Sequence, residues 1–174
     1  MTDAEFMEQA LALAKEAARD GEVPVGCVIV RDGQIVGRGR NRRERDKSAL
    51  AHAETEAIAQ ACRALGGWRL WECTLYVTLE PCPMCAGAIV NARIPRVVYG
   101  APDPKCGACG SVCDLFSMAF NHHPQVESGV LGEACGTVLR EFFQELRLEL
   151  RTRPKWRRPA NDEGDCHAAN GGSQ

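Results

Sequence analysis

Two short motifs contain residue types that could bind a metal and move a proton. The first is the tripeptide His52-Ala53-Glu54, and the second is the pentapeptide Pro81-Cys82-Pro83-Met84-Cys85. One imidazole and two thiolates suit a tetrahedral zinc, and three protein ligands leave its fourth position open, which is typical of a catalytic rather than a structural zinc. The residue types and spacing therefore predict a catalytic zinc held by His52, Cys82 and Cys85.

Glu54 is the candidate for proton transfer at this metal. It lies two residues after His52, where its carboxylate could reach a water in the open zinc position without binding the metal itself. Taken alone, Glu54 is more readily a helix-start carboxylate, and Cys82 with Cys85 could equally be a structural zinc knuckle or a redox pair. The combination of all four residues favours the catalytic interpretation.

Periodicity and turn residues predict the elements that position these motifs. Strands alternate with helices after an opening hairpin, which favours a three-layer α/β/α sandwich around a mixed five-stranded sheet. Parallel strands place their helix-starting loops at one edge of such a sheet, and both motifs fall at predicted helix starts. We expect helices at 2–19, 52–63, 81–91 and 133–150, strands at 23–30, 34–39, 74–78, 96–99 and 126–131, and irregular chain at 40–50 and 101–124.

Length and composition favour one ordinary domain. The chain has 174 residues, of which 45% are hydrophobic and 25% charged, as in soluble globular proteins. We expect a domain over residues 1–153 and a disordered tail over 154–174, which is rich in Pro, Gly and polar residues. No apolar run is long enough to span a bilayer, and the N-terminus is acidic, so we expect no membrane contact and a cytoplasmic location.

Cysteines and basic residues are unevenly distributed along the chain. With no export signal, the ten cysteines favour metal ligands and buried thiols over a disulfide framework. Cys106, Cys109 and Cys113 have a spacing that could bind a second metal, although we interpret them as buried or incidental thiols. The net charge is −2, yet basic residues cluster at 38–47 and 147–158. Each cluster is either a solvated surface or a binding surface for phosphates.

Several longer motifs extend this pattern. They are Glu22–Gly26, Asn41-Arg42, His52–Glu54, Tyr76–Ala88 and Tyr99–Lys105. In these motifs the chain resembles the cytidine deaminase-like superfamily, and more narrowly the bacterial tRNA-specific adenosine deaminases. The resemblance extends from about Phe6 to Leu148.

The resemblance implies hydrolytic deamination of adenosine to inosine at the wobble position of a tRNA anticodon, typically of an arginine tRNA. It further implies a homodimer with one Zn²⁺ per subunit. By the family pattern Asn41 would hydrogen-bond the adenine edge, and Asp103 would lie by the backbone or sugar of the anticodon loop. Lys105, Arg147 and Arg151 would contact the tRNA anticodon arm. Asn41 as a turn residue and Asp103 as a loop cap remain alternatives.

Two other function classes remain open from the sequence. A deaminase of a free nucleobase or nucleotide, such as guanine or cytosine, would share the zinc chemistry but would not need the basic cluster after Arg147. A non-catalytic, zinc-stabilised RNA-binding subunit would keep the metal ligands but would be expected to lack Glu54, which is present here.

Overall fold

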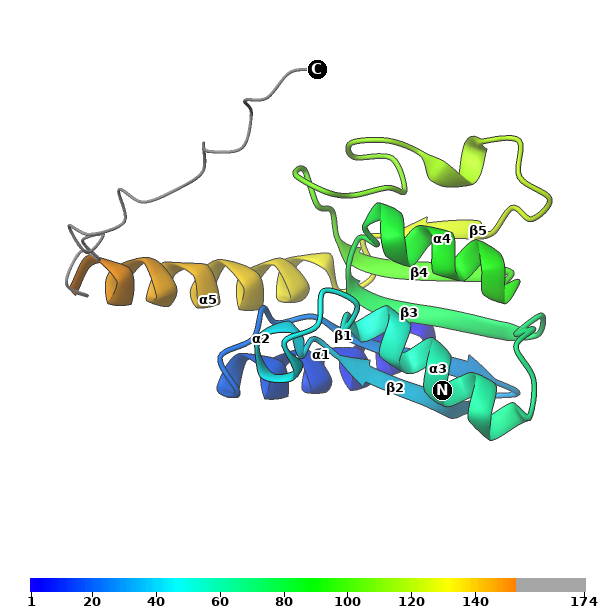
Figure 1. Ribbon diagram of the computed structural model, residues 1–174, viewed down its shortest axis with the longest axis horizontal. Helices are drawn as coiled ribbons and strands as arrows, with labels where there is room; N and C mark the ends of the chain where they lie inside the picture. The colour runs from blue at the N-terminus through cyan, green and yellow to red at the C-terminus, as the bar shows by residue number, and fades with distance from the viewer. Residues whose placement is uncertain (153–174) are drawn as a thin grey trace, which may run out of the picture.

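A mixed sheet forms the centre of the molecule. The structure, a computed structural model, describes residues 1–152. Within this range the five strands are ordered β2-β1-β3-β4-β5, and β1 is antiparallel to both of its neighbours, whereas β3, β4 and β5 are parallel (Figure 1). The predicted mixed five-stranded sheet is therefore confirmed. Its strands are β1 (Gly26–Arg31), β2 (Gln34–Arg40), β3 (Cys73–Leu79), β4 (Arg96–Ala101) and β5 (Gln125–Ser128).

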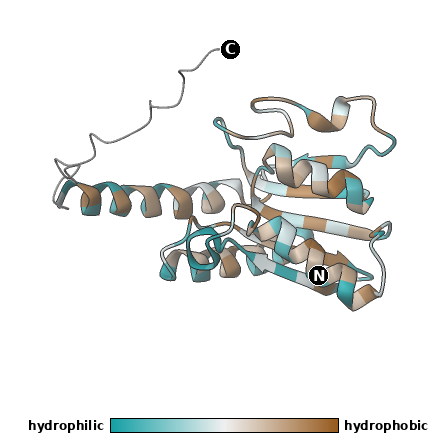
Figure 2. Cartoon of the chain, in the orientation of Figure 1, coloured by the Kyte–Doolittle hydropathy of each residue, from teal (hydrophilic) through white to brown (hydrophobic). Residues whose placement is uncertain are grey.

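Helices cover both faces of this sheet and complete the predicted three-layer sandwich. On one face α1 (Asp3–Arg19) and the start of α5 (Gly132–Thr152) enclose a buried apolar cluster. On the other face α3 (Ala53–Leu65) and α4 (Pro83–Ala92) enclose a larger cluster. Figure 2 shows that β3 and β4 are mainly hydrophobic, whereas the segment around α2 (Arg43–Asp46) is mainly hydrophilic.

The last helix is only partly covered by the rest of the domain. Val138 and Leu139 pack against the cluster beneath α1, but Phe143 and Leu150 on the predicted apolar side are exposed. Figure 1 shows why, because the second half of α5 runs out past the sheet. The apolar periodicity of this segment correctly predicted a helix. It did not predict that the second half of the helix would be exposed.

Local signals account for most element boundaries. Thr2 and Glu5 form the capping box that begins α1. Asp32 and Gly33 both have positive φ angles, as the two-residue turn between β1 and β2 requires. The first strand begins at Gly26 rather than at the predicted residue 23, because the backbone N–H of Val25 turns back to the carbonyl of Val23.

A short helix, α2 (Arg43–Asp46), lies in the segment that the sequence predicted to be irregular. Its residues are polar and exposed, so no apolar periodicity marks it. The helix start is instead held by a distant residue: the Glu22 carboxylate accepts hydrogen bonds from the backbone N–H groups of Glu44 and Arg45, at 3.2 and 2.8 Å.

Strand β2 and helix α3 approach each other closely at Gly39. A Cβ atom at this position would lie 2.0 Å from the carbonyl oxygen of Ala53, a distance that no side chain tolerates. Glycine is therefore required for the two backbones to pack directly. This contact fixes the start of α3, where His52 and Glu54 lie.

Asp3 joins three elements and makes the fold sensitive to acid. Arg96 donates to both of its carboxylate oxygens, at 2.9 and 2.8 Å, and Tyr76 donates at 2.5 Å. These bonds lower the pKa of Asp3 from 3.8 to about 2. The resulting stabilisation is fully present above the unfolded-state value of 3.8 and is lost as the pH falls from 3.8 to about 2.

We therefore expect Asp3→Asn to lower the free energy of unfolding at neutral pH and to weaken its fall in acid. Urea midpoints measured across this pH range test the expectation. Glu8→Gln, an exposed position on the same helix, is the control and should keep the wild-type acid dependence. An Asp3→Asn profile parallel to that of the wild type would contradict the assignment.

The other predictions about organisation concern the membrane and the C-terminus. Among the helices of residues 1–152, none has both the length and the apolar character needed to cross a bilayer. The predicted tail, 154–174, lies outside the described residues. The domain boundary near residue 153 therefore stays a prediction.

Candidate metal and catalytic site

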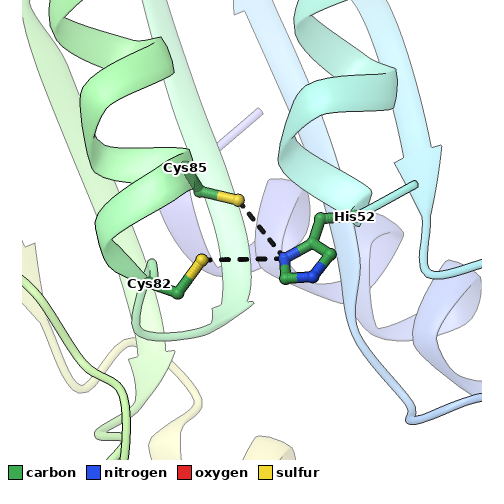
Figure 3. Close-up of side chains that lie close together, drawn as sticks. All are labelled: His52, Cys82 and Cys85. Atoms are coloured by element: carbon green, nitrogen blue, oxygen red, sulfur yellow. Dashed lines mark hydrogen bonds between the residues drawn. The ribbon is translucent and has the colours of Figure 1, made fainter. Parts of the chain in front are cut away.

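Two helix starts meet at one edge of the sheet. His52 is the N-cap of α3 and Cys82 the N-cap of α4, where Pro83 occupies the first helical turn. Both N-cap residues have an extended backbone conformation. Their side chains point toward each other between the starts of the two helices (Figure 3). Cys85 lies one turn further along α4 and faces the same point.

The three side chains have the spacing of a tetrahedral metal site. His52 Nδ1 lies 3.7 Å from Cys82 Sγ and 3.5 Å from Cys85 Sγ. A tetrahedral zinc about 2.1 Å from nitrogen and about 2.3 Å from sulfur would separate those atoms by about 3.6 Å. The donor set and its geometry therefore both fit zinc. Within residues 1–152 no second group of three such side chains lies this close, which favours the interpretation of Cys106, Cys109 and Cys113 as thiols.

The site already stabilises a thiolate. Hydrogen bonding from Cys85 and His52 lowers the pKa of Cys82 to about 4, against the opposing effect of burial. The hydrogen bond that Cys85 donates to Cys82, together with burial, raises the pKa of the Cys85 thiol. Contact with Cys82 in turn raises the pKa of His52. These shifts favour a thiolate at Cys82, and metal binding would release the proton that remains on Cys85.

Glu54 lies beside these ligands in a buried position. The residue is 4% exposed, and burial raises its pKa to about 7. A carboxyl group with a pKa near neutrality can both accept and return a proton at physiological pH. Glu54 has no place among the three clustered ligand atoms, so it is available for proton transfer.

These residues open into a small cavity. Its volume of about 200 Å³ is below the roughly 300–1,000 Å³ of sites for drug-sized ligands, and it suits one base better than a whole nucleotide. The cavity is lined by Val23, Val25, Asn41, Arg43, His52, Ala53, Glu54, Leu79, Glu80, Cys82, Asp103 and Cys106.

The predicted substrate-binding residues divide into two groups. Asn41 and Asp103 both line the cavity, although they lie far apart in the sequence. Lys105 is exposed in the loop next to Asp103, and Arg147 and Arg151 are exposed on α5. None of these three lines the cavity, so any contact that they make with a substrate lies outside the base-sized space.

The contacts of Asn41 and Asp103 bear on their alternative interpretations. Asn41 is buried, and its Nδ2 donates to Glu22 at 3.5 Å rather than to its own backbone. Asp103 does cap its loop, because its Oδ1 accepts from the backbone N–H groups of Lys105 and Cys106. It lines the cavity at the same time.

Three lining residues with polar or reactive side chains were absent from the predicted site. They are Arg43, Cys106 and Glu80. Burial would raise the pKa of the Glu80 carboxyl, but hydrogen bonds from Ser111, Asp103 and Cys109 outweigh it and lower that pKa. A carboxylate between apolar Leu79 and Pro81, next to the cysteine motif, was the signal that could have identified Glu80.

Comparison with known proteins places this site in a family. The model of the MafB19-like deaminases matches residues 1–147. The chain is also 52% identical over 143 residues to the tRNA-specific adenosine deaminase of Bacillus subtilis (strain 168), covering 82% of this chain and 89% of that protein. This chain belongs to the tRNA-specific adenosine deaminase family.

Solved structures agree with membership of the tRNA-specific adenosine deaminases. A tRNA:A34 deaminase studied for A-to-I editing at the wobble position is 48% identical, with a TM-score of 0.75 over 78% of this chain and 99% of that one. Guanine deaminase from Nitrosomonas europaea is 23% identical, with a TM-score of 0.65 over 80% and 83% of the two chains. The second likeness shows the cytidine deaminase-like fold alone.

Proposed function

We propose that this protein hydrolytically deaminates adenosine to inosine at the wobble position of a tRNA anticodon, typically of an arginine tRNA. The observation that carries the proposal is a buried Glu54 beside a metal-binding His52, Cys82 and Cys85 set, in a chain 52% identical to a tRNA-specific adenosine deaminase. The reaction consumes one water and releases ammonia. It is a hydrolase reaction with no redox step.

His52, Cys82 and Cys85 would hold one Zn²⁺ per subunit, and their spacing supports this assignment. When bound, zinc would lower the pKa of a water molecule and so make it a nucleophile at neutral pH. A cation beside Glu54 would also favour its charged form, because an opposite charge lowers the pKa of a carboxyl. The carboxylate is then ready to accept a proton.

Glu54 would perform the proton transfers of the reaction. Its carboxylate accepts a proton from the attacking water and delivers it to a ring nitrogen of the purine. It would then take the remaining proton from the added hydroxyl and deliver it to the amino group, which leaves as ammonia while the carbonyl of inosine forms. Burial supports this role, since it keeps bulk water away from the carboxylate.

Asn41 and Asp103 would bind the target nucleotide at the cavity. An amide can hydrogen-bond an adenine edge, because it offers both a donor and an acceptor, and Asp103 would lie by the sugar or backbone. Lys105, Arg147 and Arg151 would contact the anticodon arm outside the cavity. Their exposure leaves them free to pair with phosphates.

The proposal includes a homodimer that acts on tRNA in the cytoplasm. A cavity of about 200 Å³ accepts one base, so the rest of an anticodon arm must be bound by the outer surface. A second subunit would extend that surface. Loop bases can be turned into such a cavity without the cost of opening a duplex.

The test compares substrates with the zinc-loaded protein. An anticodon stem-loop carrying a wobble adenosine is incubated in parallel with free adenosine, cytidine and guanine, and each reaction is analysed for ammonia and deaminated base. Inosine from the stem-loop alone is expected. Product from a free base or nucleoside alone would overturn the tRNA assignment and would leave the zinc chemistry intact.

A further inference from the structure

Glu80 is a buried carboxylate that takes no part in the proton transfers described above. It follows β3 directly and precedes Cys82 by two residues. The residue is 2% exposed, although a buried carboxylate is costly unless its charge is compensated. Its partners therefore indicate what it does.

The segment 103–111 supplies those partners. Oε1 of Glu80 accepts from the backbone N–H groups of Cys109 and Ser111, at 2.9 and 3.0 Å. Oε2 accepts from the backbone N–H of Asp103 at 3.0 Å and from the Ser111 hydroxyl. Each oxygen thus accepts two hydrogen bonds, which uses the full capacity of an ionised carboxylate.

The segment also packs directly against this carboxylate. A Cβ atom at Gly107 would lie 2.4 Å from the carboxyl carbon of Glu80, so the backbone passes where no side chain fits. The N–H of Ala108 donates to the carbonyl of Pro81 at 2.8 Å. The loop is therefore attached to the cysteine motif and to the residue that precedes it.

This loop forms one wall of the cavity through Asp103 and Cys106. We propose that Glu80 is a positioning residue, which holds this wall in the shape that binds the substrate nucleotide. The inference rests on the proposed function, because the nucleotide is the substrate named there. Glu80 acts through the backbone of the loop and does not itself react.

Glutamine cannot replace Glu80 in this arrangement. Each carboxylate oxygen of Glu80 accepts two hydrogen bonds. Either orientation of a glutamine amide would therefore place its NH₂ group against two donors. The substitution keeps the size of the side chain and alters only its charge and its acceptors. Glu80 also lines the cavity, so Glu80→Gln is paired with Ser111→Ala, which removes one donor of the loop at a position outside the lining.

We expect Glu80→Gln to raise KM for the anticodon stem-loop roughly tenfold or more, the order of effect that losing a charge-assisted hydrogen bond produces. The kcat and the zinc content should stay near their wild-type values. Hydrogen exchange should become faster at the amides of Asp103, Cys109 and Ser111 and unchanged in α1. Selective effects on KM and on these amides distinguish positioning from general loss of stability.

Asp114→Asn is the matched control. Asp114 caps the short 3-10 turn Leu115–Ser117 in the same part of the chain; its side chain does not bond Glu80, and it is not among the residues that line the cavity. Its KM should equal that of the wild type. Ser111→Ala, which removes one of the four donors, should raise KM by a smaller factor and tests the inference if Glu80→Gln does not fold.

Two results would overturn the inference. One is a Glu80→Gln protein with wild-type KM and wild-type exchange of the loop amides, and the other is an equal rise of KM in Asp114→Asn. Failure of the unaltered protein to deaminate the stem-loop would count against the proposed function alone. Exchange of the loop amides would then still decide whether Glu80 holds the wall.

Discussion

Glu54→Gln is expected to reduce kcat by about 10²–10⁴-fold, the range typical of a lost general acid–base group, while the zinc content stays unchanged. Glutamine has nearly the same volume as glutamate, so the buried position remains filled. It cannot accept a proton from water or return one to the purine. Single-turnover rates on the stem-loop, measured together with bound zinc, test this expectation.

Glu56→Gln is the control for this substitution. Glu56 lies on the same helix and pairs with Arg42 at 2.8 Å, outside the cavity lining. Its kcat should remain close to the wild-type value. Wild-type turnover by Glu54→Gln would show that another group moves the proton, whereas loss of zinc would show that Glu54 supports the metal rather than the reaction.

The residues that could be predicted are those with local signals. His52 and Cys82 begin helices, and helix starts have recognisable N-terminal features such as Pro83. The turn at Asp32 and Gly33 follows from two residues that tolerate positive φ. Because parallel strands place successive helix starts at one edge, these short motifs were enough to predict that the metal ligands meet.

Two carboxylates whose structural roles the sequence did not reveal act over long sequence separations. Glu22 and Glu80 are buried carboxylates whose partners are backbone N–H groups of distant segments. Any residue type except proline can supply such a donor, so the sequence contains no pattern that reveals the pairing. For the same reason α2 was predicted to be a loop, since Glu22 rather than apolar packing holds its start.

The predicted RNA-binding residues differ in how far the fold supports their assignment. The fold brings Asn41 and Asp103 to the cavity, which their types alone could not establish. Lys105, Arg147 and Arg151 are on the surface, where exposed basic residues are equally expected without a ligand. Their role remains a prediction until their effect on stem-loop binding is measured at several salt concentrations.

Cys85→Ser is expected to weaken zinc binding strongly and to abolish turnover. Cys85 is fully buried and lies 3.5 Å from His52 Nδ1, and a serine hydroxyl is a harder and far less acidic ligand than a thiol. Zinc affinity should fall by more than the roughly 10–100-fold that loss of a supporting second-layer contact causes. Equilibrium dialysis against a zinc chelator measures the affinity, and the stem-loop assay measures turnover.

Cys135→Ser separates this effect from the cost of placing a hydroxyl in the core. Cys135 is 1% exposed, but it packs in the apolar cluster beneath α1 on the opposite face of the sheet. This variant should lose some stability and keep both zinc and turnover. If Cys85→Ser instead kept its zinc, another side chain would have to complete the metal site. The open position on which hydrolysis depends would then be in doubt, because three protein ligands are what leave it free.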